Sequence, residues 1–104
     1  MAEATVKTVI AFLKKEFSRQ GLKLDGIALF GSHLNGKASE GSDIDLILIS
    51  EMFKNKNIFQ RSEIVMDTEL KAIRKFKVPL DLLTLTSAEF TKAVANKRYN
   101  AKLV

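Results

Sequence analysis

The sequence predicts an α/β fold of the α+β kind, in which a small mixed β-sheet has helices packed on it. Segments with helical spacing of apolar residues alternate with short apolar runs. The run at residues 46–49 is apolar on both faces, which is typical of a central strand covered on two sides. With 104 residues, the chain is long enough for one modest core, so we expect a single domain over residues 1–104.

The first half of the chain is predicted to contain one long helix and one strand. A helix is expected over residues 3–20, with Gly21 as its stop, and a strand over residues 24–30. A short helix through residues 32–36, capped by Ser32, and a polar loop over residues 37–42 then follow. The apolar residues at helical spacing in the first helix are Val6, Val9, Ile10, Leu13 and Phe17.

The second half is predicted to contain a strand, a long helix, a second strand and a last helix. The strands span residues 43–49 and 80–84, and the long helix spans residues 58–76. Pro79 opens the later strand, where a missing N–H is tolerated, and a last helix covers residues 87–97. The long helix is expected to direct these residues toward the core: Ile58, Val65, Met66, Leu70, Ile73 and Phe76.

Three aspartates are predicted to converge beside these strands. Asp43 and Asp45 are two residues apart, so in a strand they point to the same side. Asp81 lies near the start of the next strand, and it joins them if the two strands are neighbours. Carboxylates this close repel each other unless a cation lies between them. Oxygen ligands alone favour Mg²⁺ or Mn²⁺ over Zn²⁺.

A Gly-Ser turn precedes the acidic strand. Gly31 permits close backbone approach, and the N–H groups of the turn with the Ser32 hydroxyl suit phosphate oxygens. Each feature also has a simpler explanation: the turn is only a turn, Asp43 is a cap, and Asp81 pairs with a lysine. His33 is interpreted as a loop residue rather than a catalyst. Taken together, the turn and the three acids favour phosphoryl or nucleotidyl transfer.

These residues resemble the signature of the nucleotidyltransferase superfamily related to DNA polymerase beta. The matching pattern is Gly31-Ser32, Gly36 and then Ser42-Asp43-Ile44-Asp45-Leu46, with Asp81 on a later strand. The resemblance covers about residues 24–85, and the short chain is similar to the minimal nucleotidyltransferases. One departure is that His33-Leu34-Asn35 stands where many relatives have a basic residue, although Lys37 lies just beyond.

The resemblance implies roles for individual residues. It implies that Asp43, Asp45 and Asp81 are catalytic carboxylates and ligands of Mg²⁺ or Mn²⁺, and that ATP is the substrate. Gly31, Ser32 and Ser42 are then expected to bind the nucleotide.

The resemblance also implies a protein partner. Minimal members accompany helical HEPN-domain proteins that act as toxins, and as antitoxins they transfer AMP to a toxin tyrosine. Two alternatives stay open: a non-catalytic module that neutralises a HEPN partner by occlusion, and a small-molecule nucleotidyltransferase. The sheet face that carries the acids also carries apolar residues that one short helix can cover only in part. We therefore expect an exposed apolar sheet face there, suited to a homo- or hetero-oligomer.

Charge and composition set the remaining expectations. The net charge is +5, but the lysines are scattered, which favours a solvated surface over a nucleic-acid interface. The absence of cysteine excludes disulfides and thiolate metal sites within the chain. Neither a signal peptide nor a membrane-spanning segment is evident in the sequence, so the cytoplasm is the expected location.

Overall fold

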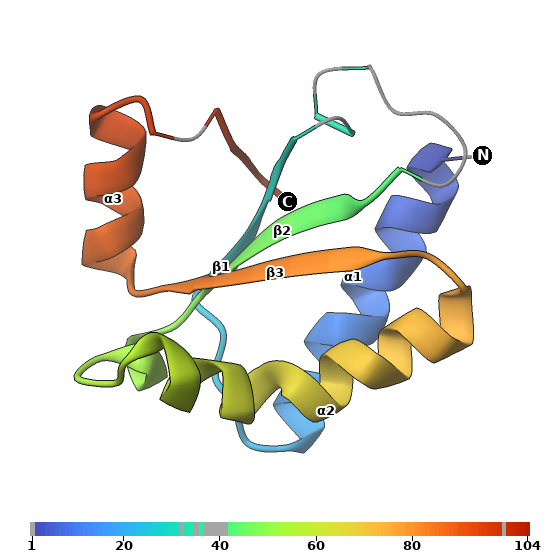
Figure 1. Cartoon of the computed structure of the whole chain (residues 1–104), viewed down its shortest axis with the longest axis horizontal. Helices are drawn as coiled ribbons and strands as arrows, with labels where there is room; N and C mark the ends of the chain where they lie inside the picture. The colour runs from blue at the N-terminus through green and yellow to red at the C-terminus, as the bar shows by residue number, and fades with distance from the viewer. Residues whose placement is uncertain (1, 32, 35, 37–41, 99) are drawn as a thin grey trace.

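The computed structural model describes residues 2–31, 33–34, 36, 42–98 and 100–104. Within these residues, helices lie on both faces of a mixed sheet, as the sequence predicts (Figure 1). A single turn of 3₁₀-helix at Glu51–Phe53 follows the second strand. The helices and strands, in chain order, are α1 (Ala2–Arg19), β1 (Gly26–Phe30), β2 (Ile44–Ile49), α2 (Ile58–Phe76), β3 (Leu80–Leu85), α3 (Ser87–Ala95) and β4 (Lys102–Leu103).

The sheet has the strand order β3-β2-β1-β4. Strand β1 pairs antiparallel with both β2 and β4, whereas β2 and β3 are parallel. A parallel pair requires a crossover, and α2 provides it. The two acidic strands are therefore neighbours, which is the condition under which Asp81 was expected to join Asp43 and Asp45. The two-residue strand β4 was not predicted.

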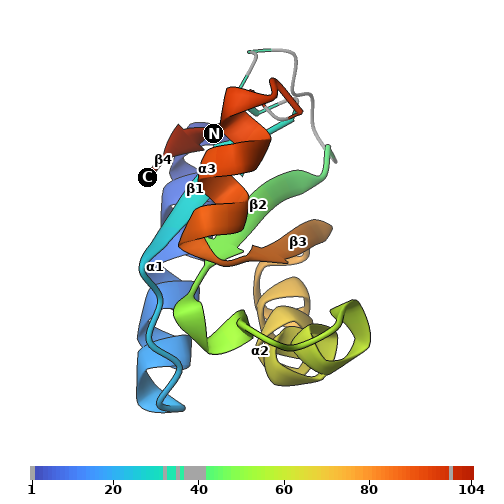
Figure 2. The same cartoon turned by 90° about the vertical axis from the view of Figure 1, so that its left-hand side faces the viewer.

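Two apolar cores lie on opposite faces of the sheet. Figure 2 shows how the helices are arranged about the strands. Helices α1 and α2 pack on one face, and they meet alternate residues of β2 such as Ile44 and Leu46, which are fully buried. On the other face α3 contributes Phe90, which packs against Ile47 and Ile49. The predicted inward face of α1 is confirmed, since all five of its residues belong to the first core.

The ends of α2 and α3 are set by local hydrogen bonds. Asn57 and Gln60 form a reciprocal capping box at the start of α2, and Thr86 and Glu89 form another at the start of α3. Helix α2 ends at Lys77, which has a left-handed φ of 56°. The expected bounds of α2 agree with the structure, and those of α3 end two residues earlier than expected.

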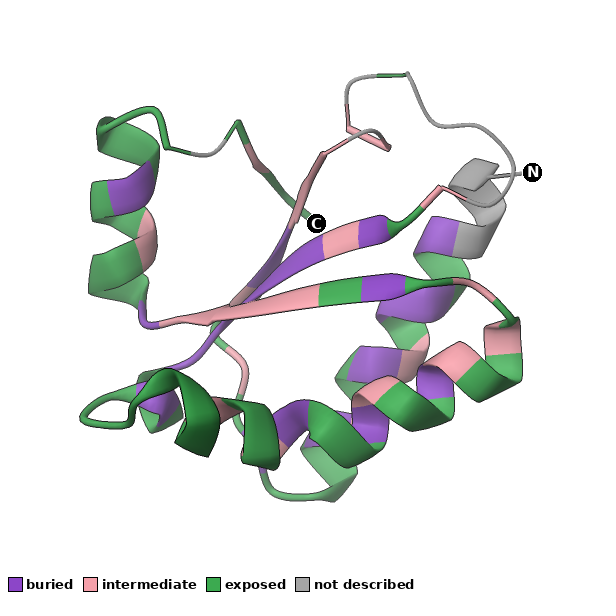
Figure 3. Ribbon diagram, in the orientation of Figure 1, coloured by how far each residue is buried: buried purple, intermediate pink, exposed green. Residues whose placement is uncertain are grey.

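The prediction for the inward face of α2 is partly wrong. Val65 is buried as expected, but Ile58, Met66 and Leu70 are 69%, 48% and 41% exposed (Figure 3). Phe59 is 76% exposed. The helix has apolar residues on two faces, and the sheet has room for only one of them. Part of the exposed apolar surface therefore lies on the outer side of α2.

The expected exposed apolar sheet face is also wrong. Ile47 and Ile49 are at most 4% exposed, because Phe90, Phe30 and Ala101 pack over them. The prediction assumed that one short helix would cover this face only in part. In the structure α3, the end of β1 and the segment leading to β4 cover it together.

The short helix expected after Ser32 is not seen at its described positions. His33, Leu34 and Gly36 lie in turns, and the Leu34 N–H donates to the Gly31 carbonyl over 3.1 Å. Ser32 itself lies outside the described residues.

Arg61 connects the start of α2 to the start of α3. Its guanidinium donates to both carboxylate oxygens of Glu89, at 2.7 and 3.1 Å, and to the Thr84 carbonyl at 3.0 Å. The Arg61 side chain is only 12% exposed, so it is shielded from competing water. Because Glu89 also closes the capping box of α3, this ion pair helps to hold α3 on the sheet.

We expect Arg61→Ala to lower the free energy of unfolding by about 2 kcal/mol, since a charged hydrogen-bond donor to a carboxylate and a carbonyl is lost. Urea denaturation would measure the change. Arg98→Ala removes an exposed arginine just after α3 and is the matched control, with an expected change within about 0.5 kcal/mol. Equal losses for the two variants would contradict a role for Arg61 in fixing α3.

Candidate active site

The parallel pairing of β2 and β3 places two of the predicted acids side by side. Asp45 and Asp81 are register partners, so their side chains emerge on the same face of adjacent strands. Ile44 and Leu46 face the core under α1 and α2, so Asp45 lies on the opposite face, the one that carries α3. Asp43 lies just before β2. The structure therefore brings the three aspartates to one end and one face of the sheet.

The pKa of Asp45 reflects its burial and its two acidic neighbours. Burial raises the pKa of Asp45 above its ordinary value, and the charges of Asp81 and then Asp43 raise it further. Asp45 is half-buried, whereas Asp43 and Asp81 are exposed. The site thus favours either a proton or a bound cation at Asp45.

Gly31 allows the Asp45 carboxylate to lie directly against the backbone of the turn. Its φ is +75°, a conformation that residues with a side chain rarely adopt. A Cβ placed here would overlap Oδ2 of Asp45 and would lie 2.9 Å from its Cγ. Phe30, the residue before the turn, is the register partner of Asp45 in β1. The glycine therefore brings the predicted phosphate-binding turn into contact with the predicted metal ligand.

Two further titratable residues belong to this site, and sequence reasoning did not assign them to it. His33 lowers the pKa of Asp45 by its charge, and its Nε2 lies 3.4 Å from the Ser42 carbonyl oxygen. Glu69 of α2 is half-buried, and its pKa is raised by burial and by the charge of Asp81. The position of His33 within the Gly-Ser motif could have indicated its role. Nothing in the local pattern around Glu69 places it near Asp81.

The three aspartates offer the type of ligand atom that a hard divalent cation such as Mg²⁺ prefers. The three aspartates offer only oxygen atoms, and the mutual repulsion that raises the pKa of Asp45 is relieved by a cation. In their present positions, the described residues contain no group of three acidic, histidine or cysteine side chains that could hold a metal ion. The three aspartate side chains therefore have to draw closer together for all of them to share one ion.

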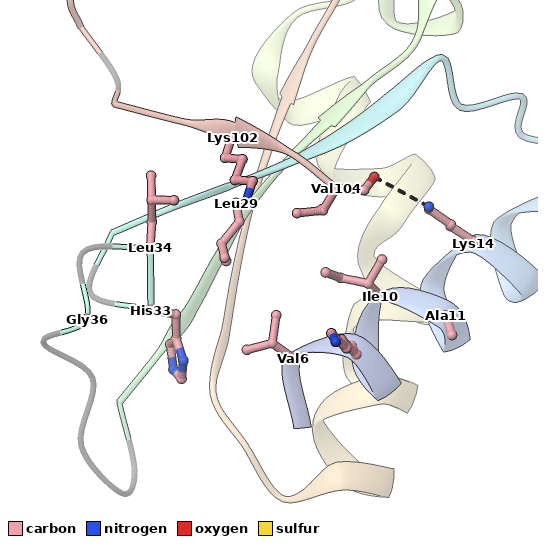
Figure 4. Close-up of a pocket in the computed structure, with 11 residues that line it drawn as sticks. Val6, Ile10, Ala11, Lys14, Leu29, His33, Leu34, Gly36, Lys102 and Val104 are labelled. Carbon is pink, nitrogen blue, oxygen red and sulfur yellow. Dashed lines mark hydrogen bonds between the residues drawn. The ribbon is translucent and has the colours of Figure 1, made fainter. Parts of the chain in front are cut away.

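A pocket of about 760 Å³ lies on the other side of the Gly31 turn, and none of the three aspartates lines it. Its apolar wall comes from α1, β1 and β4, with lysines from α1 and β4 beside it (Figure 4). His33 lines this pocket and also acts on Asp45, so the turn separates the two sites. Residues that define the pocket include Val6, Ile10, Lys14, Leu29, Lys102 and Val104.

Comparison with known protein families identifies this arrangement. Residues 7–104 match the family model described as the nucleotidyltransferase domain. The chain belongs to this family. The family match spans every candidate site residue, including Gly31, Ser42 and the three aspartates.

Solved structures support the same fold for this nucleotidyltransferase domain. One is a protein assigned as a nucleotidyltransferase from Sulfolobus solfataricus, with a TM-score of 0.64 at 23% identity, covering 96% of this chain and 76% of that one. Another is a chain from a toxin–antitoxin complex with AMP-PNP, with a TM-score of 0.59 at 21% identity, covering 94% of this chain and 70% of that one. No curated protein matches the sequence. The fold is therefore the polymerase beta-like α+β fold.

Among the described residues of this nucleotidyltransferase, no helix is both long enough and apolar enough to cross a lipid bilayer.

Proposed function

We propose that this chain transfers a nucleoside monophosphate from a nucleoside triphosphate to a hydroxyl group. The hydroxyl oxygen forms a bond to the α-phosphorus, the bond between that phosphorus and its bridging oxygen breaks, and pyrophosphate leaves. The single observation that carries the proposal is the register pairing of Asp45 with Asp81, beside Asp43 and the Gly31 turn.

Each residue has a distinct task in this proposal. Asp43, Asp45 and Asp81 hold Mg²⁺ or Mn²⁺, which when bound supplies positive charge to the triphosphate. Asp81, exposed at the edge strand, accepts the proton of the attacking hydroxyl. The turn at Gly31, with Ser32 and Ser42, binds the phosphates through N–H and hydroxyl donors. His33 lies beside Asp45, where its imidazolium form adds a positive charge.

The nucleotide is proposed to be ATP, and the acceptor a tyrosine of a HEPN-domain toxin, so that the chain acts as an antitoxin. The structural neighbour from a toxin–antitoxin complex with AMP-PNP supports this choice. The resemblance to minimal nucleotidyltransferases supports it independently. Such a reaction places a bulky anion on the toxin and so masks the tyrosine.

Transfer of label from α-labelled ATP to the toxin, with Mg²⁺ present, tests the proposal. We expect the native chain to label the toxin and the Asp43→Asn/Asp45→Asn variant to lose at least about a thousandfold in rate, which corresponds to several kcal/mol of electrostatic stabilisation. Asp67→Asn, an exposed change on α2, is the matched control and should label at the native rate.

Two results would point elsewhere. If the Asp43→Asn/Asp45→Asn variant neutralises the toxin as well as the native chain does, the function is occlusion rather than transfer. Labelling of a toxin whose tyrosines have all been changed to Phe would rule out tyrosine as the acceptor while keeping the transferase activity.

A further inference from the structure

Helix α2 carries an apolar stripe on the side that faces away from the sheet. Phe59, Met66 and Leu70 are 76%, 48% and 41% exposed. They are separated by seven and four residues, so at 3.6 residues per turn they lie within an arc of about 40° on the helix surface. The buried residues of the same helix, Val65 and Ala72, lie on the opposite side. Three large apolar side chains in line on one helix are typical of a helix–helix contact.

Beside this stripe, the acidic residues precede the basic residues along the helix. Glu63 and Asp67 lie in the first part of the helix, and Lys71 and Arg74 lie in the last part. Glu63 and Arg74 are about 40° and 60° from Phe59 around the helix, so both border the same edge of the stripe. Lys71 already pairs with Glu16 at 3.2 Å. Neither Glu63 nor Arg74 takes part in an ion pair with any other residue that the structure describes.

We propose that the stripe binds a second copy of this chain, with the two α2 helices antiparallel about a two-fold axis. The axis passes near residue 68, so Met66 of each copy lies against Leu70 of the other. The same register places Glu63 of one copy beside Arg74 of the other, twice by symmetry, and Phe59 beside Lys77. In an antiparallel pair the same edge of the stripe meets on both helices, so these opposite charges face each other directly.

The positions of Glu63 and Arg74 favour a second copy of this chain, bound in the antiparallel orientation. In a parallel pair opposite edges of the stripe would meet, so Glu63 and Arg74 of one copy would lie on the far edge from those of the other and form no ion pair across the interface. The antiparallel pair makes the surface complementary to itself, as a two-fold interface requires. Because the stripe points away from the sheet and Asp45 lies on the far face, both candidate active sites stay open in the dimer.

Charge reversal of the two residues tests this interface in sedimentation equilibrium on the full chain. The native chain is expected to form a concentration-dependent dimer. Glu63→Lys and Arg74→Glu should each raise the dissociation constant at least about tenfold, because each turns two attractive contacts into repulsive ones. The double variant Glu63→Lys/Arg74→Glu should regain native affinity, and an equimolar mixture of the two single variants should form a heterodimer.

Lys92→Glu, an exposed reversal on α3, is the matched control and should leave the dimer unchanged. Far-UV circular dichroism checks that each variant is folded. A native chain that stays monomeric at millimolar concentration would overturn the proposal. So would a dimer that both single reversals leave intact, or one that the double variant fails to restore.

Discussion

Replacing Gly31 by alanine is expected to lower the free energy of unfolding by about 3 kcal/mol. Roughly 1 kcal/mol comes from forcing a side chain into a left-handed backbone conformation, here with φ of +75°. The remainder comes from the overlap of the new Cβ with the Asp45 carboxylate, which has to move or distort the turn. Urea denaturation of the metal-free chain would measure the loss.

Gly21→Ala separates the two contributions. Gly21 has a similar φ of +82°, but a Cβ added there meets nothing within 4 Å. This control should lose only about 1 kcal/mol. In an Asp45→Ala background the overlap with the carboxylate is removed and only a 3.2 Å approach to the Cβ of residue 45 remains, so Gly31→Ala should cost much less than in the native chain. A Gly31→Ala loss that is the same with and without Asp45 would contradict the contact between turn and carboxylate.

Asp45→Asn is expected to change stability and activity in opposite directions. In the metal-free chain, burial and the charges of Asp81 and Asp43 disfavour the ionised Asp45, so its neutral replacement should stabilise the fold by about 1 kcal/mol. For a domain of this size that corresponds to a rise in Tm of roughly 4 °C. Transfer activity should fall by at least about a thousandfold, since the ligand charge is lost.

The pH dependence of the same variant gives a second measurement. A carboxyl whose folded pKa is raised contributes stability while it is protonated, and that contribution is lost as the pH rises through the folded pKa. The native chain should therefore lose stability relative to Asp45→Asn as the pH rises above 4. Adding Mn²⁺ at neutral pH should raise the Tm of the native chain more than that of the variant. Parallel stability curves for the two proteins would contradict the raised pKa.

Local patterns were sufficient to predict most of the fold and the three acids. Alternation of helical and strand segments predicted both acidic strands but not their pairing, and it is the observed parallel pairing of β2 and β3 that brings Asp45 to Asp81. The aspartates were informative because burying an unpaired charge in an apolar strand is costly, so a carboxylate there indicates a partner or a ligand. The roles of these aspartates in catalysis stay a prediction.

The errors come from information that a local pattern does not contain. Helix α2 has two apolar faces, and periodicity cannot tell which one the sheet covers, so Met66 and Leu70 were wrongly placed in the core. Strand β4 has only two residues, too few to show alternation. Glu69 approaches Asp81 only through the packing of α2 beside β3, and His33 only through the turn at Gly31.

The register of β3 against β2 has a consequence for how the protein becomes active. Because side chains alternate along a strand, a slip of one residue would turn Asp81 to the face covered by α1 and α2. Asp45 would then have no acidic partner on β3. The two strands are separated along the chain by the whole of α2, so this alignment requires the closure of a long loop. A polypeptide with the two strands misaligned would therefore contain all three aspartates but lack the pairing of Asp45 with Asp81 on which the proposed activity depends.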